Sequence, residues 1–191
     1  GVVRSTETGR RLYNGNISIG TYAIAGINAG ATHGKSYTYD QLNRLILSRL
    51  HTAISGSFPY WDYTTNDAAY AESFGYDANG NILRSYRNGA STVQSPLFMD
   101  ALLYNYNRDG AGNLINNRLN YITDNIPGNY HYADIDYQNP NNYKYDKIGN
   151  LISDESEYIA GIEWTLYGKI ASVWNGYTGI DYGYDAAGYR I

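Results

Sequence analysis

The sequence predicts an all-β protein, a repeat-built, curved antiparallel sheet made of successive β-hairpins. The first observation is composition, because the 191 residues include 23 Tyr and 21 Gly but only 3 Phe, 1 Met and 4 Pro. Tyr favours the half-buried surface of a pleated sheet, whereas Gly and Asn supply the positive φ that tight hairpin turns need. The second observation is a motif that recurs along the chain at the spacing of a hairpin.

The recurring motif reads aromatic-x-Tyr-Asp-x-x-Gly/Asn-x-aliphatic, in four clear copies and three looser ones. In the last three copies the second aromatic residue is Tyr145, Trp164 and Tyr184, which gives steps of 19 and 20 residues. A unit of about 20 residues is the length of one hairpin with its connection. The clear copies begin at Tyr37, Phe74, Tyr143 and Tyr182, and the looser ones cover 13–17, 104–114 and 162–170.

Each part of the motif has a physical role in a hairpin. Tyr37 and Tyr39 are two residues apart, so on a strand they share a face, and we expect them to stack on the rings of the next repeat. The Asp begins a type I turn and accepts the amide hydrogens of that turn, and the Gly three residues later takes the positive φ. The motif positions expected to build the repeat are Tyr39, Asp40, Tyr76, Asp77, Gly80, Asn81, Tyr106, Gly112, Asn113, Tyr145, Asp146, Gly149, Asn150, Trp164, Gly168, Tyr184, Asp185 and Gly188.

Other segments depart from the regular motif. In the copy at 104–114 we place a two-residue expansion before Gly112. The pairs Asn88-Gly89 and Asn175-Gly176 predict further hairpin turns. Residues 120–142, with two Pro and few aliphatic residues, predict a long loop or irregular insertion. Short helices are expected only at 66–73 and 95–103, the second opening with Ser-Pro.

Length and charge limit the function classes. A chain of 191 residues allows one domain, residues 1–191, with a core of its own. The net charge of −4 and the lack of a Lys/Arg block argue against nucleic-acid binding. The start of the chain has no signal-peptide pattern, and no stretch is long and apolar enough for a membrane span, so any export signal is expected outside this chain. There is no Cys, which excludes disulfides and thiolate metal sites.

The Tyr-Asp-x-x-Gly-Asn-Leu pattern resembles the RHS or YD repeat of bacterial polymorphic toxins, the C component of Tc toxins, wall-associated bacterial proteins and teneurins. The resemblance covers residues 12–191. It implies a long antiparallel sheet that spirals into a hollow shell around a C-terminal toxin or effector, and a wall with no catalysis of its own. The expected partners are the rest of the shell and the enclosed toxin or effector, in a secreted or cell-surface protein.

The resemblance also implies that this chain is a wall segment of about ten strands, a fragment of a longer shell. The Asp-Pro-x-Gly element of the self-cleavage region in such shells does not occur in the sequence. We therefore assign neither self-cleavage nor a toxin activity to this chain. Unpaired sheet edges at the ends of the segment predict self-association through those edges.

Several segments resemble catalytic or ligand-binding motifs, but a structural role in the repeats explains each of them better. The segment 30–36 resembles a phosphate-binding loop but has three residues between its glycines instead of four, and strand-like residues follow. The histidines His33, His51 and His131 are isolated, so a catalytic Ser-His-Asp set is possible only by assembly across strands. The segment 109–113 could be a calcium-binding loop, but a turn capped by its own Asp explains it. The acidic segment 154–157 could supply paired carboxylates for glycoside hydrolysis, but a solvated loop tip explains it. No enzyme activity, metal or cofactor is expected.

A binding module is the alternative to the shell wall. Tyr, Asn, Ser and Gly are the residue types of adaptable binding surfaces, and Tyr and Trp rings also stack on sugars. Carbohydrate binding has been suggested for YD-repeat proteins, so a glycan or a protein is the alternative partner. Trp61 lies outside the motif and is the best single candidate for a ligand contact.

Overall fold

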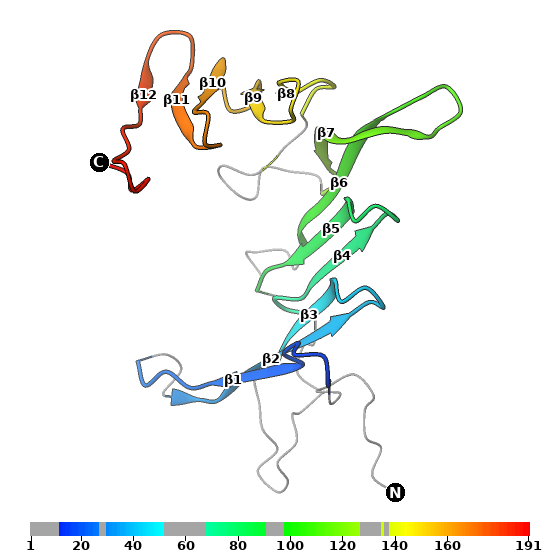
Figure 1. Cartoon of the computed structure of the whole chain (residues 1–191). Helices are drawn as coiled ribbons and strands as arrows, with labels where there is room; N and C mark the ends of the chain where they lie inside the picture. Colours follow the sequence, from blue (N-terminus) through cyan, green and yellow to red (C-terminus); the bar gives the residue numbers. More distant parts are fainter. Residues whose placement is uncertain (1–11, 27–29, 52–67, 91–97, 127–134, 136–137) are drawn as a thin grey trace, which may run out of the picture. The chain divides into compact units, whose positions relative to one another are not determined.

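The computed structural model describes residues 12–26, 30–51, 68–90, 98–126, 135 and 138–191. Within these ranges the chain forms twelve β-strands and no α-helix, which confirms the predicted all-β class. Strands β1 to β7 form one sheet in sequence order, β8 and β9 a second, and β10, β11 and β12 a third (Figure 1). Within each sheet, neighbouring strands are consecutive in the sequence, which confirms the prediction of successive hairpins.

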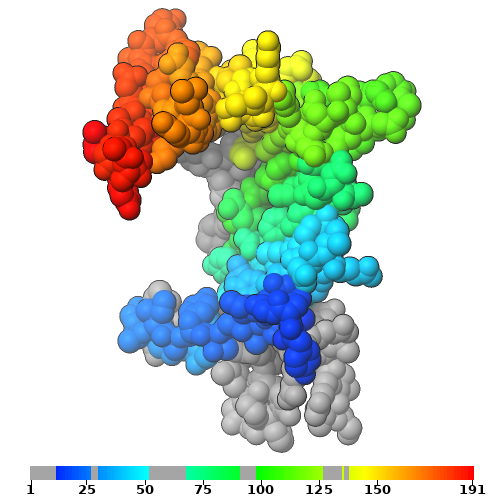
Figure 2. All heavy atoms as spheres, viewed as in Figure 1, coloured from blue at the N-terminus to red at the C-terminus, as the bar shows by residue number. Residues whose placement is uncertain are grey.

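The chain divides into two compact units, Gly1–Leu103 with Asp124–Asp134, and Tyr104–Thr123 with Ile135–Ile191. The long strands β6 and β7 contribute residues to both units. The strands of the first unit are β1 (Ile19–Tyr22), β2 (His33–Tyr39), β3 (Leu45–His51), β4 (Glu72–Tyr76), β5 (Ile82–Asn88) and the start of β6 (Phe98–Arg108). Figure 2 shows β2 to β5 in order from blue to green.

The second unit consists of shorter hairpins. It contains most of β7 (Leu114–Asp124), together with β8 (Tyr143–Tyr145), β9 (Leu151–Asp154), β10 (Gly161–Trp164), β11 (Ile170–Trp174) and β12 (Gly179–Asp181). All pairs within β8–β9 and β10–β12 are antiparallel. Four of the described hairpins have a bulge just before the turn, between Thr38 and Tyr39, between Gly75 and Tyr76, between Lys144 and Tyr145, and between Glu163 and Trp164.

Buried side chains in the described ranges are mostly polar. The buried apolar residues are Ala101, Leu102, Ile122 and Ile162, whereas ten buried residues are polar or charged. Ser48 is one example of how the buried polar groups are satisfied, because its Oγ donates to Glu72 Oε2 at 2.8 Å, and Lys35 Nζ donates to the same oxygen at 3.1 Å. The hairpins are therefore held together mainly by hydrogen bonds between neighbouring strands, and less by a single apolar core.

Both predicted helices are wrong where the structure describes them. Ala68 to Tyr70 form a turn, Tyr70 has a φ of 55°, and Glu72 already belongs to β4; residues 66 and 67 lie outside the described ranges. Residues 98–103 of the second predicted helix are in β6, and 95–97 are outside the described ranges. Pairing with β5 satisfies the amides of both segments, which overrides a weak local helix preference.

Two turn and loop predictions need correction. Asn175-Gly176 does form the turn between β11 and β12, where Asn175 N donates to Thr178 O and Gly176 has a φ of 94°. Asn88 instead ends β5 and pairs with Phe98, so the connection to β6 is longer than a tight turn. The predicted loop at 120–142 begins later than expected, because β7 continues to Asp124 and thereby satisfies those backbone groups.

Candidate functional site

Six hairpin turns in the described ranges share one backbone geometry. In each turn the amide of the first residue donates to the carbonyl four residues ahead, as from Asp77 N to Asn81 O at 3.0 Å. The amide three residues ahead donates back to the first carbonyl, as from Gly80 N to Asp77 O at 3.2 Å. That residue has a positive φ in all six turns, which confirms the predicted turn and its Gly position. The turns begin at Asp40, Asp77, Asp109, Asp146, Thr165 and Asp185.

The side chain of the first residue caps its own turn. Asp77 Oδ1 accepts from the amide of Asn81 at 2.8 Å, and its Oδ2 accepts from Asn81 Nδ2 at 2.8 Å. Asp146 makes the same two bonds to Asn150, at 2.9 and 3.0 Å. The carboxylates therefore accept hydrogen bonds from the amides of their own turns. Asp109 makes the same two bonds to Asn113, as the sequence predicts for 109–113.

These hydrogen bonds favour the charged carboxylates. The backbone N–H of Arg44 is the largest influence on Asp40 and, with the Arg44 side chain, lowers the pKa of that carboxyl below its ordinary value of 3.8. For Asp77, desolvation raises the pKa, but the hydrogen bonds from the Asn81 side chain and amide outweigh it, so the pKa lies below 3.8. The pKa of Asp146 is lowered in the same way by Asn150.

The second aromatic residue of a motif copy donates a hydrogen bond to the preceding hairpin. Tyr76 Oη donates to Leu45 O at 2.7 Å, and Tyr184 Oη donates to Ile170 O at 2.8 Å. The acceptor is in each case the aliphatic residue that ends the preceding motif copy. The same bond runs from Tyr39 Oη to Ile17 O at 3.0 Å and from Trp164 Nε1 to Leu151 O at 2.7 Å.

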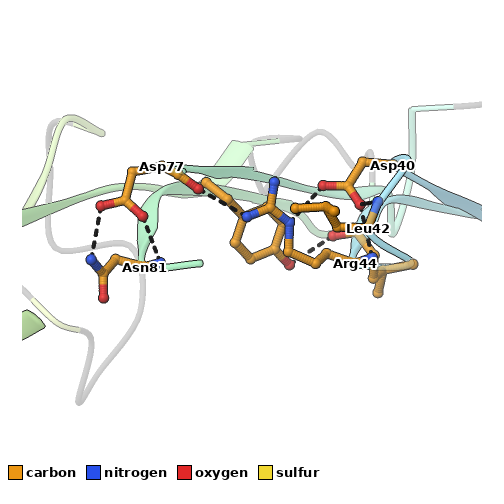
Figure 3. Close-up of polar contacts among 7 residues, drawn as sticks. Asp40, Leu42, Arg44, Asp77 and Asn81 are labelled. Carbon is orange, nitrogen blue, oxygen red and sulfur yellow. Dashed lines mark hydrogen bonds and ion pairs between the residues drawn. The ribbon is translucent and has the colours of Figure 1, made fainter. Parts of the chain in front are cut away.

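A cation from the preceding hairpin lies over two of these rings, those of Tyr76 and Tyr184. Arg44 Cζ lies 4.7 Å from the centre of the Tyr76 ring, and Arg44 Nη1 donates to Asp77 O at 2.9 Å (Figure 3). The Arg44 Nε also donates to Asp40 Oδ2 at 2.6 Å. One side chain therefore joins two consecutive turns. We call this combination of aromatic-to-carbonyl hydrogen bond and cation over the ring the hairpin lock.

The second unit contains the hairpin lock as well. Lys169 Nζ lies 5.0 Å from the centre of the Tyr184 ring and donates to Gly188 O in the next turn. A variant occurs at Tyr145, where Arg118 Cζ lies 5.8 Å from the ring centre and Arg118 Nη2 donates to Lys147 O at 3.1 Å. Each cation contacts both the aromatic ring and the turn that follows it.

Sequence reasoning missed these cations and expected ring stacking instead. Within the described residues Tyr37 and Tyr39 stack on no other ring, and the recorded stacked pair is Tyr22 with His33, with centroids 5.6 Å apart. The signal was present in the sequence, because Arg44 and Lys169 occupy the motif position that is Asn in the copies ending at Ile82, Leu114 and Leu151.

The copy at 104–114 contains a regular turn in place of the predicted expansion. Asp109 is the first residue of that turn, since its amide donates to Asn113 O at 2.9 Å and Gly112 has a φ of 84°. Tyr106 lies within β6, three residues before the turn. The extra residues lengthen both strands of this hairpin instead of its loop.

The remaining candidates from the sequence have mixed outcomes. Trp61 and His131 lie outside the described residues. The segment that resembles a phosphate loop leads into β2 and not into a helix, as expected. His51 is not isolated, because its Nε2 lies 2.8 Å from Ser36 Oγ across β2 and β3, and both residues are buried. This pair forms because facing strands bring together residues 15 apart in the sequence.

The acidic segment 154–157 is only partly a solvated loop tip. Residues 155–157 are exposed, but Asp154 is buried and its Oδ1 accepts from Asn142 Nδ2 at 2.9 Å. Asn142 Oδ1 in turn accepts from Ser156 N at 2.7 Å. The buried amide of Asn142 thus links the start of this loop to the residue that precedes β8, which sequence spacing could not show.

The described residues contain no group of three His, Cys, Asp or Glu side chains able to hold a metal ion. In the same residues no helix is long and apolar enough to cross a membrane. No protein family and no curated protein matches the chain. The recurring turns and hairpin locks are therefore the features from which a function is inferred.

Proposed function

We propose that this chain is a structural segment of an RHS/YD-repeat β-shell, which encloses a C-terminal toxin or effector in a secreted or cell-surface bacterial protein. The observation that supports it most is the hairpin lock, in which Tyr76 and Tyr184 each bond the hairpin before them. A contact that repeats from one hairpin to the next lets a sheet extend along the chain by adding units. That is the property a shell wall requires.

The distribution of buried groups supports the same function. A wall is one sheet thick over much of its area and cannot rely on a single deep core. The four buried apolar side chains in the described ranges match that requirement, as do carboxylates such as Asp77 that satisfy their own turn amides. In this proposal the segment contributes structure and no catalytic group.

The test is the state of the protein in its source cells. Intact mass and peptide mapping across Ile191 are expected to give a mass several times 21.4 kDa, with sequence that continues beyond Ile191. Limited proteolysis of that native protein is expected to leave the C-terminal segment protected until the wall is unfolded. A mature 21.4 kDa chain, or a C-terminal segment cleaved as fast as when isolated, would contradict the proposal.

A carbohydrate- or protein-binding module is the second candidate function. It is favoured by exposed aromatic rings in the second unit, where Tyr158, Tyr167 and Tyr177 are 82%, 91% and 96% exposed. A groove of about 770 Å³ between the turns at 165–169 and 185–188 is also lined by Tyr182 and other aromatic residues. Saturable glycan or cell-surface binding that is lost in a folded Trp61→Ala variant would support this function over the wall.

Self-association through sheet edges is a further part of the proposal. All three residues of β12 are exposed, and Ile180 is 61% exposed. An exposed edge strand is a template for pairing with another chain. Sedimentation at increasing protein concentration is expected to show growing mass, and a concentration-independent monomer would refute this pairing.

A further inference from the structure

Trp174 lies on a face of the β10–β12 sheet between two glycines. The strand register places Gly161 of β10 on one side of it and Gly179 of β12 on the other. A Cβ added at Gly161 would meet Trp174 Cζ2 at 2.0 Å and Cε2 at 2.4 Å, so the indole covers the backbone of Gly161. The ring therefore lies over the sheet, and Trp174 remains 36% exposed.

The next row of the same face carries two carboxylates. Because strand residues alternate between faces, Glu163, Ser172 and Asp181 share the face of Trp174, and the register pairs them across the three strands. Glu163 and Asp181 are exposed, and Glu163 Oε2 accepts from Ser172 Oγ at 3.3 Å. Neither carboxylate forms an ion pair with the described part of the chain. We call Trp174, Glu163 and Asp181 the Trp174 face.

The cations close to this part of the chain contact other rings. Lys169 lies over Tyr184, and Arg190 Cζ lies 5.9 Å from the ring centre of Tyr182. The Trp174 face therefore combines an exposed indole with two carboxylates that form no ion pair with a cation of the described residues. Glycine in a strand interior weakens the strand and often marks close approach of a ligand or another backbone. Here the missing Cβ of Gly161 leaves the space in which the indole lies on the sheet.

We propose that the Trp174 face is a docking site for an arginine side chain of a partner protein. Trp is the best aromatic partner for a cation, and a planar guanidinium stacks on the ring while its fork of N–H groups bonds a carboxylate. The compact ammonium of lysine matches a flat ring and a carboxylate less well. A neutral sugar would stack on the indole but would leave both charges unpaired. This inference deepens the second candidate function and does not depend on the shell wall.

The test uses the indole N–H signals of the whole chain in ¹⁵N-correlated NMR spectra. The three Trp residues give three such signals, and a Trp174→Phe variant assigns the one from Trp174. A short peptide with blocked ends, whose one charged residue is a central arginine, is expected to shift the Trp174 signal saturably. The matched lysine peptide is expected to bind about fivefold more weakly, and the citrulline peptide, which keeps the shape without the charge, is expected to bind about tenfold more weakly.

Variants of single carboxylates test the role of charge without removing the ring. Glu163→Gln is expected to weaken the arginine peptide about fivefold while leaving the amide spectrum of the sheet unchanged. Glu157→Gln, which removes an exposed charge elsewhere in the same unit, is the matched control and is expected to bind as the parent does. Arginine and citrulline peptides of equal affinity, or an unaffected Glu163→Gln variant, would overturn the inference.

The same titration distinguishes arginine docking from the binding-module function and from the shell-wall function. A neutral oligosaccharide that shifts the Trp174 signal, with no response to the arginine peptide, would overturn arginine docking and leave the binding-module function in place. The absence of any shift by the arginine peptide at millimolar concentration would overturn the docking site alone. The mass and protease measurements on the native protein decide the shell wall independently.

Discussion

The hairpin lock of the first unit and that of the second unit make the same contacts over different lengths of chain. Tyr76 reaches Leu45 across 31 residues, whereas Tyr184 reaches Ile170 across 14. In both units a cation lies over the ring and donates to the following turn. The comparison teaches that the lock depends on the two hairpins themselves and not on the length of the segment between them.

The two locks also differ in chemistry. The first unit uses Arg44, paired with the Asp40 carboxylate at 2.6 Å. The second unit uses Lys169, whose amide donates to the Thr165 hydroxyl at 3.1 Å, so a neutral side chain takes the place of Asp. The turn backbone is the same in both, which shows that the carboxylate adds capping but is not required to form the turn.

The largest effect is expected in the second unit, at Gly161, where an added Cβ would meet a ring. Gly161→Ala would place Cβ within 2.5 Å of three Trp174 ring carbons, and displacing the ring is expected to cost about 2 to 3 kcal/mol. Native-state hydrogen exchange of the β10–β12 amides measures the loss. Gly110→Ala, where nothing lies within 4 Å of the added Cβ, is the control and is expected to change stability by less than about 0.5 kcal/mol.

The turn glycines give the next largest effect. Gly149 has a φ of 103°, and Gly149→Val is expected to cost about 2 kcal/mol, since a β-branched residue is strained at positive φ. Asn43 takes the same place in the first unit with a φ of 62°. Asn43→Gly is therefore expected to leave stability nearly unchanged. An unaltered thermal midpoint for Gly149→Val would refute the turn assignment.

The hydroxyls of the hairpin locks are expected to contribute equally in the two units. Tyr76→Phe and Tyr184→Phe each remove one hydrogen bond to a backbone carbonyl and are expected to cost about 1 kcal/mol. Hydrogen exchange of the amides in the adjacent hairpin measures each loss. Tyr177→Phe, at a side chain 96% exposed, should have no measurable effect. A loss of stability in only one of the two units would show that the two hairpin locks are not equivalent.

Acid is expected to destabilise the turns of Asp40, Asp77 and Asp146 and to leave the Thr165 turn unchanged. The pKa values of Asp40, Asp77 and Asp146 are lowered in the folded chain, so their contribution to stability is present above the ordinary value of 3.8. It is lost as the pH falls below 3.8 through the folded pKa values. NMR signals of the Asp77 turn are expected to weaken or shift in that range, whereas those of Thr165 stay. Equal sensitivity of both turns would contradict this account.

Sequence alone predicted the turns because each is closed within five residues. The Asp77 amide, its carboxylate and the φ of Gly80 are all local features that one motif copy displays. The locks were missed because their partners lie one hairpin apart, and a pattern cannot show which ring a cation such as Arg44 covers. The helix predictions failed for a related reason, since strand pairing outweighs weak local preferences.

The measurement that tests the central claim most directly is a pair of double-mutant cycles. Arg44→Met with Tyr76→Leu, which removes both the hydroxyl and the ring, probes the lock of the first unit, and Lys169→Met with Tyr184→Leu probes that of the second. Amide exchange at Asp77 and Asp185, whose N–H groups close the two turns, measures the stability of each hairpin. The account predicts coupling energies of about 0.5 to 1 kcal/mol in both units. Additive losses in both cycles would contradict it.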